Sequence, residues 1–342
     1  MKIMKMRKSM IVILALAILS FLSPIAIGEQ TYILHILILI FIFAAFGQSW
    51  NLLAGFAGQI SLGHHAFFGI GAYTLGLLVY YHSPFKMNPW PALILGGLMS
   101  MLIGLPIGAI CFRLRGPYFA LATLAASEVI RLIILNTEFT LAGRGVVIPP
   151  PSAVQLGPLS ISFRSKIPYY YISLTMMLIV FLVTYLVVRS RLGFKLLAIR
   201  EDEETAATLG ISPFRTKLFA LTISVFFAGI LGALYGQYMT YIDALTDPGG
   251  VLAPWTGLDA ILISLIGGMG TIAGPIIGAT IRMGLGETLR VIFGWRAGVD
   301  LLIFGLLLIS IVLFFRKGIW GFIRVAYRLG GNERWPYLKL RA

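Results

Sequence analysis

The chain has 342 residues, of which 58% are hydrophobic and only 12% are charged. A soluble domain is about one quarter charged, so the composition excludes an ordinary soluble protein and indicates that lipid is the solvent. The single cysteine, Cys111, excludes an intramolecular disulfide and a cysteine-built metal cluster. The apolar runs are continuous rather than alternating, which disfavours a membrane barrel of strands. We therefore predict an all-α, polytopic membrane protein.

Stretches of about 20 apolar residues, long enough to cross about 30 Å of hydrocarbon, recur along the chain. We predict about eight full spans in a single transmembrane domain, residues 1–342. The spans are expected at residues 10–27, 32–53, 66–81, 90–112, 117–135, 169–188, 218–242 and 298–315. A cleaved signal peptide is the alternative for the first, because "AIGE" at 26–29 resembles a processing site. The apolar run there exceeds the usual length of about 7–15 residues, which favours a retained span.

Lysine and arginine are concentrated in four segments between these spans. Residues 1–8, 113–115, 189–217 and 316–342 hold 19 of the 27 basic residues. Cytoplasmic loops are enriched in Lys and Arg, so we predict that both termini are cytoplasmic. Residues 136–168 then form an external loop, and 316–342 form a cytoplasmic tail. Topology signals and lipid headgroups account for the net charge of +14, and no nucleic-acid partner is expected.

The region between the seventh and last spans must begin and end outside. Residues 255–266 would form about 18 Å of helix, which reaches only mid-membrane. The stretch "GGMG" at 267–270 would then be a turn, and residues 271–293 the return. Irregular backbone at that depth must be buried in protein or line a wet cavity. We predict a broken or re-entrant element at 255–293, close to the translocation path; two ordinary tilted helices are the alternative.

The stretch "GHHAFFGIGAY" at 63–73 contains two of the four histidines. Adjacent helix positions point about 100° apart, so His64 and His65 cannot form the i, i+4 pair of a zinc site, and we predict no metal. The glycines instead predict a turn and close helix contacts, where Ser61 and one histidine would satisfy freed backbone groups. Residues expected in helix packing or along the path are Gly58, Gly63, Gly69, Gly71, Gly267, Gly268, Gly270, Gly274 and Gly278.

Residues 189–217, "RSRLGFKLLAIREDEETAATLGISPFRTK", form the one strongly hydrophilic internal segment. Within it, 201–210 predict a short helix whose acidic first turn suits the helix dipole. Gly210 suits the left-handed end of that helix, and Ser212 and Pro213 suit the start of the next. The residues expected to face another protein are Glu201, Glu204, Ala206, Ala207 and Gly210. A solvated loop whose acids offset its bases is the alternative.

Charged residues inside the predicted spans are candidates for function, because each costs about 2.5–3.5 kcal/mol to insert. Glu128 and Arg131 stand at i, i+3, and Glu287 and Arg290 repeat that spacing. Each pair can neutralise itself on one helix face. Arg282 has no evident local partner. The alternative is that both pairs lie near the outer interface and only pair with each other.

Several segments together resemble a known family. They are "NLLAGFAGQISLGHHAFFGIGAY", "LRGPYFALATLAASEVIRL", "AIREDEETAATLGISPFRTKLFALTISVFFAGILGALYG", "LIGGMGTIAGPIIGA" and "FRKGIWG". As a set, over most of residues 50–320, they resemble the LivM-type permease of ABC importers for branched-chain amino acids. The resemblance makes 201–210 a cytoplasmic coupling helix, with Thr205 where the family pattern has alanine. The loop "TLAGRG" at 140–145 departs from a Thr-Gly-Gly-type family sequence.

The resemblance also implies partners and a location. The partners would be a related LivH-type permease, two cytosolic ABC ATPases and an external amino-acid-binding protein, in a prokaryotic inner membrane. The chain has no G-x-x-x-x-G-K-[ST] loop for ATP phosphates and no catalytic constellation that stands out. We therefore expect no enzyme activity and no cofactor, and import of leucine, isoleucine or valine by alternating access. Urea, amides or another small solute as cargo, and a stand-alone secondary transporter, are the alternatives.

Overall fold

The computed structural model describes residues 24, 31–80, 83–85, 87–151, 154–156, 159–244, 250–293, 302–303, 305–306, 309 and 318–322. The predicted first span lies outside these residues except for one position. Of the predicted last span only residues 302–303, 305–306 and 309 are described, and of the tail at 316–342 only residues 318–322. The all-α, polytopic class is confirmed within the described residues, where five helices are long and apolar enough to cross a membrane. The expected count of eight spans stays a prediction.

The spanning helices begin and end within a few residues of the predicted bounds. They are α2 (Thr31–Ala57), α4 (Pro89–Cys111), α5 (Pro117–Asn136), α6 (Ile167–Arg189) and α9 (Pro213–Met239). Two shorter apolar helices, α3 (His64–Val79) and α10 (Pro254–Gly267), lie among them, and α11 (Gly274–Phe293) follows α10. Proline occurs at the start of α4, α5 and α9, where its missing N–H leaves no helix hydrogen bond unmade.

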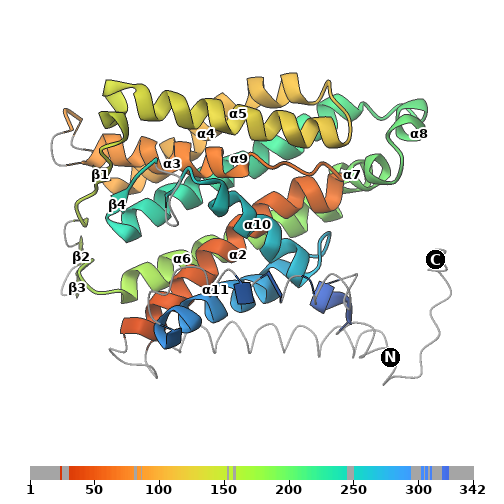
Figure 1. The fold of residues 1–342 in the computed structure, drawn as a ribbon. Coiled ribbons are helices and arrows are strands. Elements are labelled where there is room, and N and C mark those ends of the chain that lie inside the picture. Colours follow the sequence, from red (N-terminus) through yellow and green to blue (C-terminus); the bar gives the residue numbers. More distant parts are fainter. Residues whose placement is uncertain are drawn as a thin grey trace.

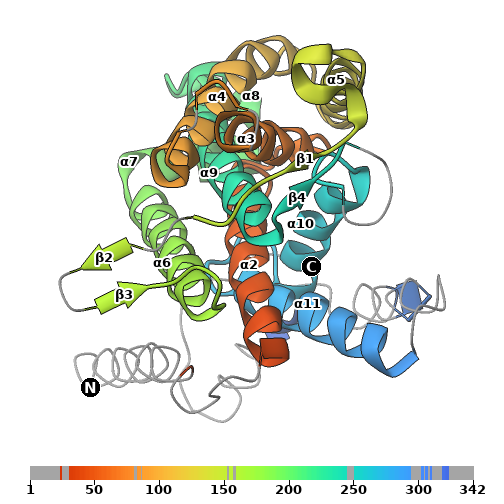
Figure 2. The same cartoon turned by 90° about the vertical axis from the view of Figure 1, so that its left-hand side faces the viewer.

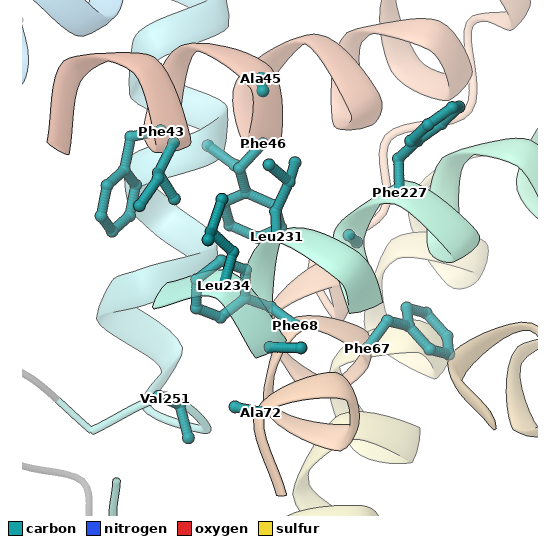
Figure 3. Packing of buried hydrophobic residues seen from close by; sticks show 14 of the residues in the cluster. Phe43, Ala45, Phe46, Phe67, Phe68, Ala72, Phe227, Leu231, Leu234 and Val251 are labelled. Carbon is teal, nitrogen blue, oxygen red and sulfur yellow. The ribbon is translucent and has the colours of Figure 1, made fainter. Parts of the chain in front are cut away.

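Helices α2 and α9 occupy the middle of the bundle, and the other helices surround them (Figure 2). Most side chains of both helices are buried, whereas α4, α5 and α6 expose large apolar side chains such as Leu102, Leu121 and Leu182. Between α2, α3 and α9, the rings of Phe46 and Phe68 have centroids 4.6 Å apart (Figure 3). An apolar outer surface is stable where lipid is the solvent, and it leaves the polar groups to be satisfied inside.

Backbones of neighbouring helices touch at glycine. A Cβ atom on Gly71 of α3 would lie 1.9 Å from the Gly229 carbonyl oxygen of α9. A Cβ atom on Gly232 of α9 would lie 1.8 Å from the Phe68 carbonyl oxygen. Dispersion between closely approaching backbones holds helices together where lipid removes the hydrophobic driving force. The α3–α9 interface therefore depends on glycine from both sides.

The two ends of the bundle differ in structure (Figure 1). One end carries the short helices α7 (Arg191–Glu201) and α8 (Glu203–Thr208). The other carries the 3-10 helix Glu138–Gly143 and four short strands: β1 (Val146–Val147) pairs with β4 (Tyr241–Ile242), and β2 (Val154–Leu156) pairs with β3 (Leu159–Ile161), both antiparallel. The described parts of 136–168 and the segment 189–217 thus lie at opposite ends, as the predicted topology requires.

Both short apolar helices begin inside the bundle. After α2, the chain turns back at Gly58 (φ +70°) and the indole Nε1 of Trp50 donates to the Ser61 carbonyl, 2.7 Å away, just before α3. Before α10, Leu252 and Ala253 are fully buried, and a Cβ on Gly69 would lie 2.2 Å from Leu252 Cδ2. Irregular backbone is tolerated at this depth because protein surrounds it.

The starting depth of α10 corrects the predicted depth of the "GGMG" turn. The turn exists, with Gly268 at φ +123° and Gly270 at φ +75°. It does not lie mid-membrane, because the amide of Gly270 donates to Asn51 Oδ1, 2.8 Å away, near the C-terminal end of α2. The half-helix was expected to start at the outer surface, but α10 starts inside and runs toward the α7–α8 end.

Candidate functional site

The predicted short helix is present as α8, and it is shorter than residues 201–210. Asp202 is its N-cap: Oδ1 accepts from the Thr205 amide at 2.5 Å. Hydrogen bonds with Thr205 lower the pKa of the Asp202 carboxyl below its ordinary value. Gly210 adopts φ +82°, the left-handed conformation expected after a helix end. Pro213 begins α9 with Ser212 as its N-cap residue, as predicted.

The residues before α8 form a second helix, α7, in place of the predicted loop. Ser190 caps it by accepting from the Leu192 amide at 3.2 Å. Gly193, Leu196 and Ile199 are its buried face, and their spacing of three residues is a helix signal. Glu201 ends α7, so it is not in the first turn of α8, where Glu203 and Glu204 stand.

Two ion pairs connect α8 to the spanning helices. Glu203 Oε2 lies 2.6 Å from Lys217 Nζ of α9, and the Lys217 side chain is only 1% exposed. Its ammonium group also lies over the Phe112 ring, 5.7 Å from the centroid. Glu204 Oε1 lies 2.6 Å from Arg115 Nη1 in the α4–α5 loop, with both side chains exposed. No local pattern in the sequence indicates these pairs, because Glu203 and Lys217 stand 14 residues apart and Glu204 and Arg115 stand 89 apart.

The two alanines of α8 do not share one free face. Ala206 is buried against the bundle, whereas Ala207 is exposed. Leu209, just after α8, is 76% exposed, and Phe194 of α7 is 69% exposed. Ala206 therefore packs α8 against the bundle. The exposed surface contains Leu209 and Phe194 together with the predicted Glu201, Glu204, Ala207 and Gly210.

A buried polar segment, residues 47–51 of α2, contacts several other elements. The Gly47 carbonyl accepts from Ser264 Oγ of α10 at 2.9 Å. The Ser49 carbonyl accepts from Ser224 Oγ of α9, which is itself 2.7 Å from His64 Nε2 of α3. Asn51 holds the α10–α11 turn at two atoms, since it accepts from the Gly270 amide and its Nδ2 donates to the Thr271 carbonyl at 2.8 Å. This segment fixes α3, α9, α10 and the turn relative to α2.

The break before α3 is satisfied only in part by the predicted residues, since His65 hydrogen-bonds to the Leu62 backbone as expected of one histidine. Trp50 donates to the Ser61 carbonyl, and the Leu62 amide donates to Thr123 Oγ1 at 3.1 Å. The Ser61 hydroxyl has no partner among the described residues, so the expected role of Ser61 is wrong. It borders a cavity of about 10 Å³, which Ser127 also lines, roughly the space of one water. Among the described residues, no three His, Cys, Asp or Glu side chains could hold a metal ion.

The predicted packing glycines make close contacts in the structure. A Cβ on Gly63 would lie 2.1 Å from the Thr123 carbonyl oxygen, and one on Gly278 would lie 1.8 Å from the Ile263 carbonyl oxygen. Gly267 and Gly274 touch each other across the α10–α11 turn, where a Cβ on Gly267 would lie 1.8 Å from the Gly274 carbonyl oxygen. These are packing contacts, and a role in lining the path stays a prediction.

The intramembrane charges are placed as follows. Arg282 of α11 does have a partner: its Nε donates to Asp259 Oδ1 of α10, 2.7 Å away. The partner was not evident because it stands on another helix. Arg131 pairs with Glu128 on α5, with Nε donating to Oε2 at 2.9 Å. The Glu287 carbonyl accepts from Tyr32 Oη at 2.8 Å, and the Arg290 side chain lies outside the described residues.

These features define a class of protein. Spanning helices enclose the two short helices α3 and α10, which begin inside the bundle. The polar segment of α2 bonds to α10 directly and to α3 through Ser224 of α9, and the capped helix α8 is bonded to α9 and to the α4–α5 loop. Short helices that begin inside a membrane-spanning bundle resemble the discontinuous helices of membrane transporters. A family model described as "Branched-chain amino acid transport system / permease component" matches residues 32–312. The chain belongs to this permease family, and the resemblance found in its sequence is confirmed.

Curated relatives agree with the family. The chain is 31% identical over 307 residues to the high-affinity branched-chain amino acid transport system permease protein LivM of Escherichia coli (strain K12), covering 83% of this chain and 69% of LivM. The Salmonella typhimurium LivM protein is 30% identical over the same shares. The permease protein LivH of Escherichia coli (strain K12) is 24% identical over 286 residues, covering 79% of this chain and 89% of LivH. No solved structure matches the chain.

Proposed function

We propose that this chain is a membrane subunit that passes leucine, isoleucine or valine into the cytoplasm, with energy from partner ATPases. The observation that carries the proposal is α8, a capped helix bonded to α9 through Lys217 and to the α4–α5 loop through Arg115. A helix held in this way transmits a displacement, caused by a cytosolic partner, to several spans at once. The names of the relatives support the cargo.

The proposal includes an assembly in a prokaryotic inner membrane. A second, LivH-type permease, two cytosolic ATPases and an external amino-acid-binding protein complete it, and ATP is bound by the partners. The α7–α8 end faces the cytoplasm, and the described parts of 136–168 face outside. Both termini are then cytoplasmic, and no cofactor belongs to this chain.

Transport would proceed by alternating access. Closure of the ATPases displaces α8, and its bonded neighbours α9 and α7 follow. Because α3, α9 and α10 are fixed to residues 47–51 of α2, a shift of α9 changes the packing around both short helices. The interior therefore rearranges as a unit rather than helix by helix.

The first test is purification of the chain with its partners from the native membrane in mild detergent, followed by reconstitution with ATP. Recovery of two P-loop ATPases and a second permease, with ATP-dependent leucine uptake, supports the proposal. Uptake of urea but not leucine would show that the proposed cargo is wrong. Uptake by the chain alone, without ATPases, would replace the mechanism with that of a stand-alone transporter.

Two variants test α8 itself. Gly210→Pro forces φ from +82° to about −65°, and Glu204→Lys places a second cation beside Arg115. Both are expected to lower uptake and its coupling to ATP hydrolysis while membrane insertion stays intact. Glu138→Lys, the same charge change at the strand end of the bundle, is the matched control. Unchanged uptake in both α8 variants would remove α8 from the mechanism.

A further inference from the structure

Helix α7 packs its buried face on the spanning helices, and an arginine in its last turn adds a polar contact to α2. The Nη1 atom of Arg200 donates to the Gly55 carbonyl of α2 at 2.6 Å. The end of a helix carries partial negative charge on its last carbonyls, so a guanidinium is favoured there. A Cβ on Gly58 would lie 3.2 Å from Arg200 Cγ, so the chain after α2 packs against the aliphatic part of the same side chain.

The guanidinium also lies against the α10–α11 turn. A Cβ on Gly270 would lie 2.6 Å from Arg200 Nη1 and 2.9 Å from the Gly55 carbonyl oxygen. Gly318 also packs on the turn, since a Cβ added to it would lie 2.4 Å from Gly268 Cα. Arg200 therefore contacts a junction where α2 and the turn meet without space for a side chain at Gly270.

Helix α7 is joined directly to α8. Asp202 donates its amide to the Ala198 carbonyl of α7 at 3.1 Å and caps α8 with its carboxylate. Asp202 is thus both the C-cap of α7 and the N-cap of α8. A displacement of α8 is carried into α7 at Asp202, two positions from Arg200.

We propose that Arg200 is a positioning residue that transmits the movement of α8 to the α10–α11 turn. The inference rests on the proposed function, because it takes α8 as the helix that is driven. When α8 moves, the guanidinium shifts at the Gly55 carbonyl and displaces the turn that Asn51 holds. The ion pair between Asp259 and Arg282 makes α10 and α11 follow together.

The transport test uses the whole assembly and three variants. Arg200→Gln is expected to lower the maximal rate of leucine uptake about tenfold, the scale of a lost charge-assisted hydrogen bond, with KM changed less than about twofold. Arg200→Lys keeps the charge and one donor, and is expected to recover part of the rate. Arg191→Gln removes the same charge at the exposed start of α7 and is expected to leave uptake unchanged. Equal losses in Arg200→Gln and Arg191→Gln, or no recovery with lysine, would overturn the proposal.

A second test does not depend on transport. Asp202→Ala removes the cap of α8, and hydrogen exchange then reports on the turn at residues 267–273 in the purified assembly. We expect Asp202→Ala to raise exchange in this turn, and to add nothing in the Arg200→Gln background. An unchanged turn in Asp202→Ala, or equal effects in both backgrounds, would overturn the proposal. If the unmodified assembly shows no ATP-dependent uptake, the proposed function fails. The exchange result then still decides whether Arg200 transmits a movement of α8 to the α10–α11 turn.

Discussion

Lys217 shows how an ionised side chain is held at the base of a membrane helix. It is 1% exposed and lies 2.6 Å from Glu203, whose side chain is 28% exposed. A buried charge is tolerated only when it is paired, and removal of its partner leaves the cost of desolvation without compensation. The neighbouring pair of Glu204 and Arg115 is exposed on both sides, and exposed pairs contribute little to stability.

This contrast gives a prediction about two adjacent glutamates. Glu203→Gln leaves Lys217 buried without an anion, and is expected to destabilise the chain by about 2 kcal/mol. Glu204→Gln breaks an exposed pair and is expected to change stability by less than about 1 kcal/mol. Thermal unfolding of the purified variants in one detergent measures both. A melting temperature that falls equally in the two variants would contradict the structural distinction.

The cap of α8 predicts a pH dependence. Hydrogen bonds with Thr205 lower the folded-state pKa of Asp202, so the cap's contribution to helix stability is fully present above the ordinary aspartate pKa of about 3.9. It is lost as pH falls through the lowered pKa. The protection factor of the Thr205 amide is expected to fall across that interval. Asn is an equally good N-cap that does not titrate, so Asp202→Asn is expected to show protection without this pH dependence.

At the scale of elements, hydropathy predicted the spanning helices well because lipid requires long apolar segments. The bounds of α4 and α5, predicted at 90–112 and 117–135, agree with Pro89–Cys111 and Pro117–Asn136. The same reasoning missed α7, whose charged residues resemble a loop although Leu196 and Ile199 are buried at helical spacing. Hydropathy also could not predict how deep in the bundle α10 begins. The buried segment before α10 is placed by the contact of Leu252 with Gly69 of α3, which is distant in sequence.

The glycine contacts between α3 and α9 give an element-scale prediction. Gly71→Ala would place a Cβ 1.9 Å from the Gly229 carbonyl oxygen, so the two backbones must separate. Overpacking of this kind costs about 1–3 kcal/mol, and we expect a lower melting temperature. Gly284→Ala on α11 is the matched control, since its Cβ would meet nothing nearer than Ile40 Cδ1 at 4.0 Å. A loss in Gly284→Ala as large as in Gly71→Ala would show that helix glycine as such, rather than close approach, decides stability.

At the scale of the whole molecule, an interior with hydrogen bonds across several elements lies between two different ends. Hydrogen bonds in the interior join residues of different elements, such as Ser224 with His64 and Asn51 with Gly270. No sequence pattern predicts these pairs, because each depends on how helices distant in sequence pack. The position of α8 could be predicted, since capping residues and charge act locally. The family follows from the ordered set of segments, and the internal connections follow only from the fold.

The proposed orientation gives a prediction that covers the whole chain. Leu209 beside α8 and Val147 in β1 are 76% and 66% exposed, and they lie at opposite ends of the bundle (Figure 1). Cys111 is buried, and its replacement by serine gives a background for single new cysteines. In intact cells, a membrane-impermeant maleimide is expected to label Val147→Cys. It should label Leu209→Cys only after the inner membrane is opened. The reverse pattern would place α8 outside, away from any cytosolic ATPase, and the driving force would then have to come from the substrate or an ion gradient.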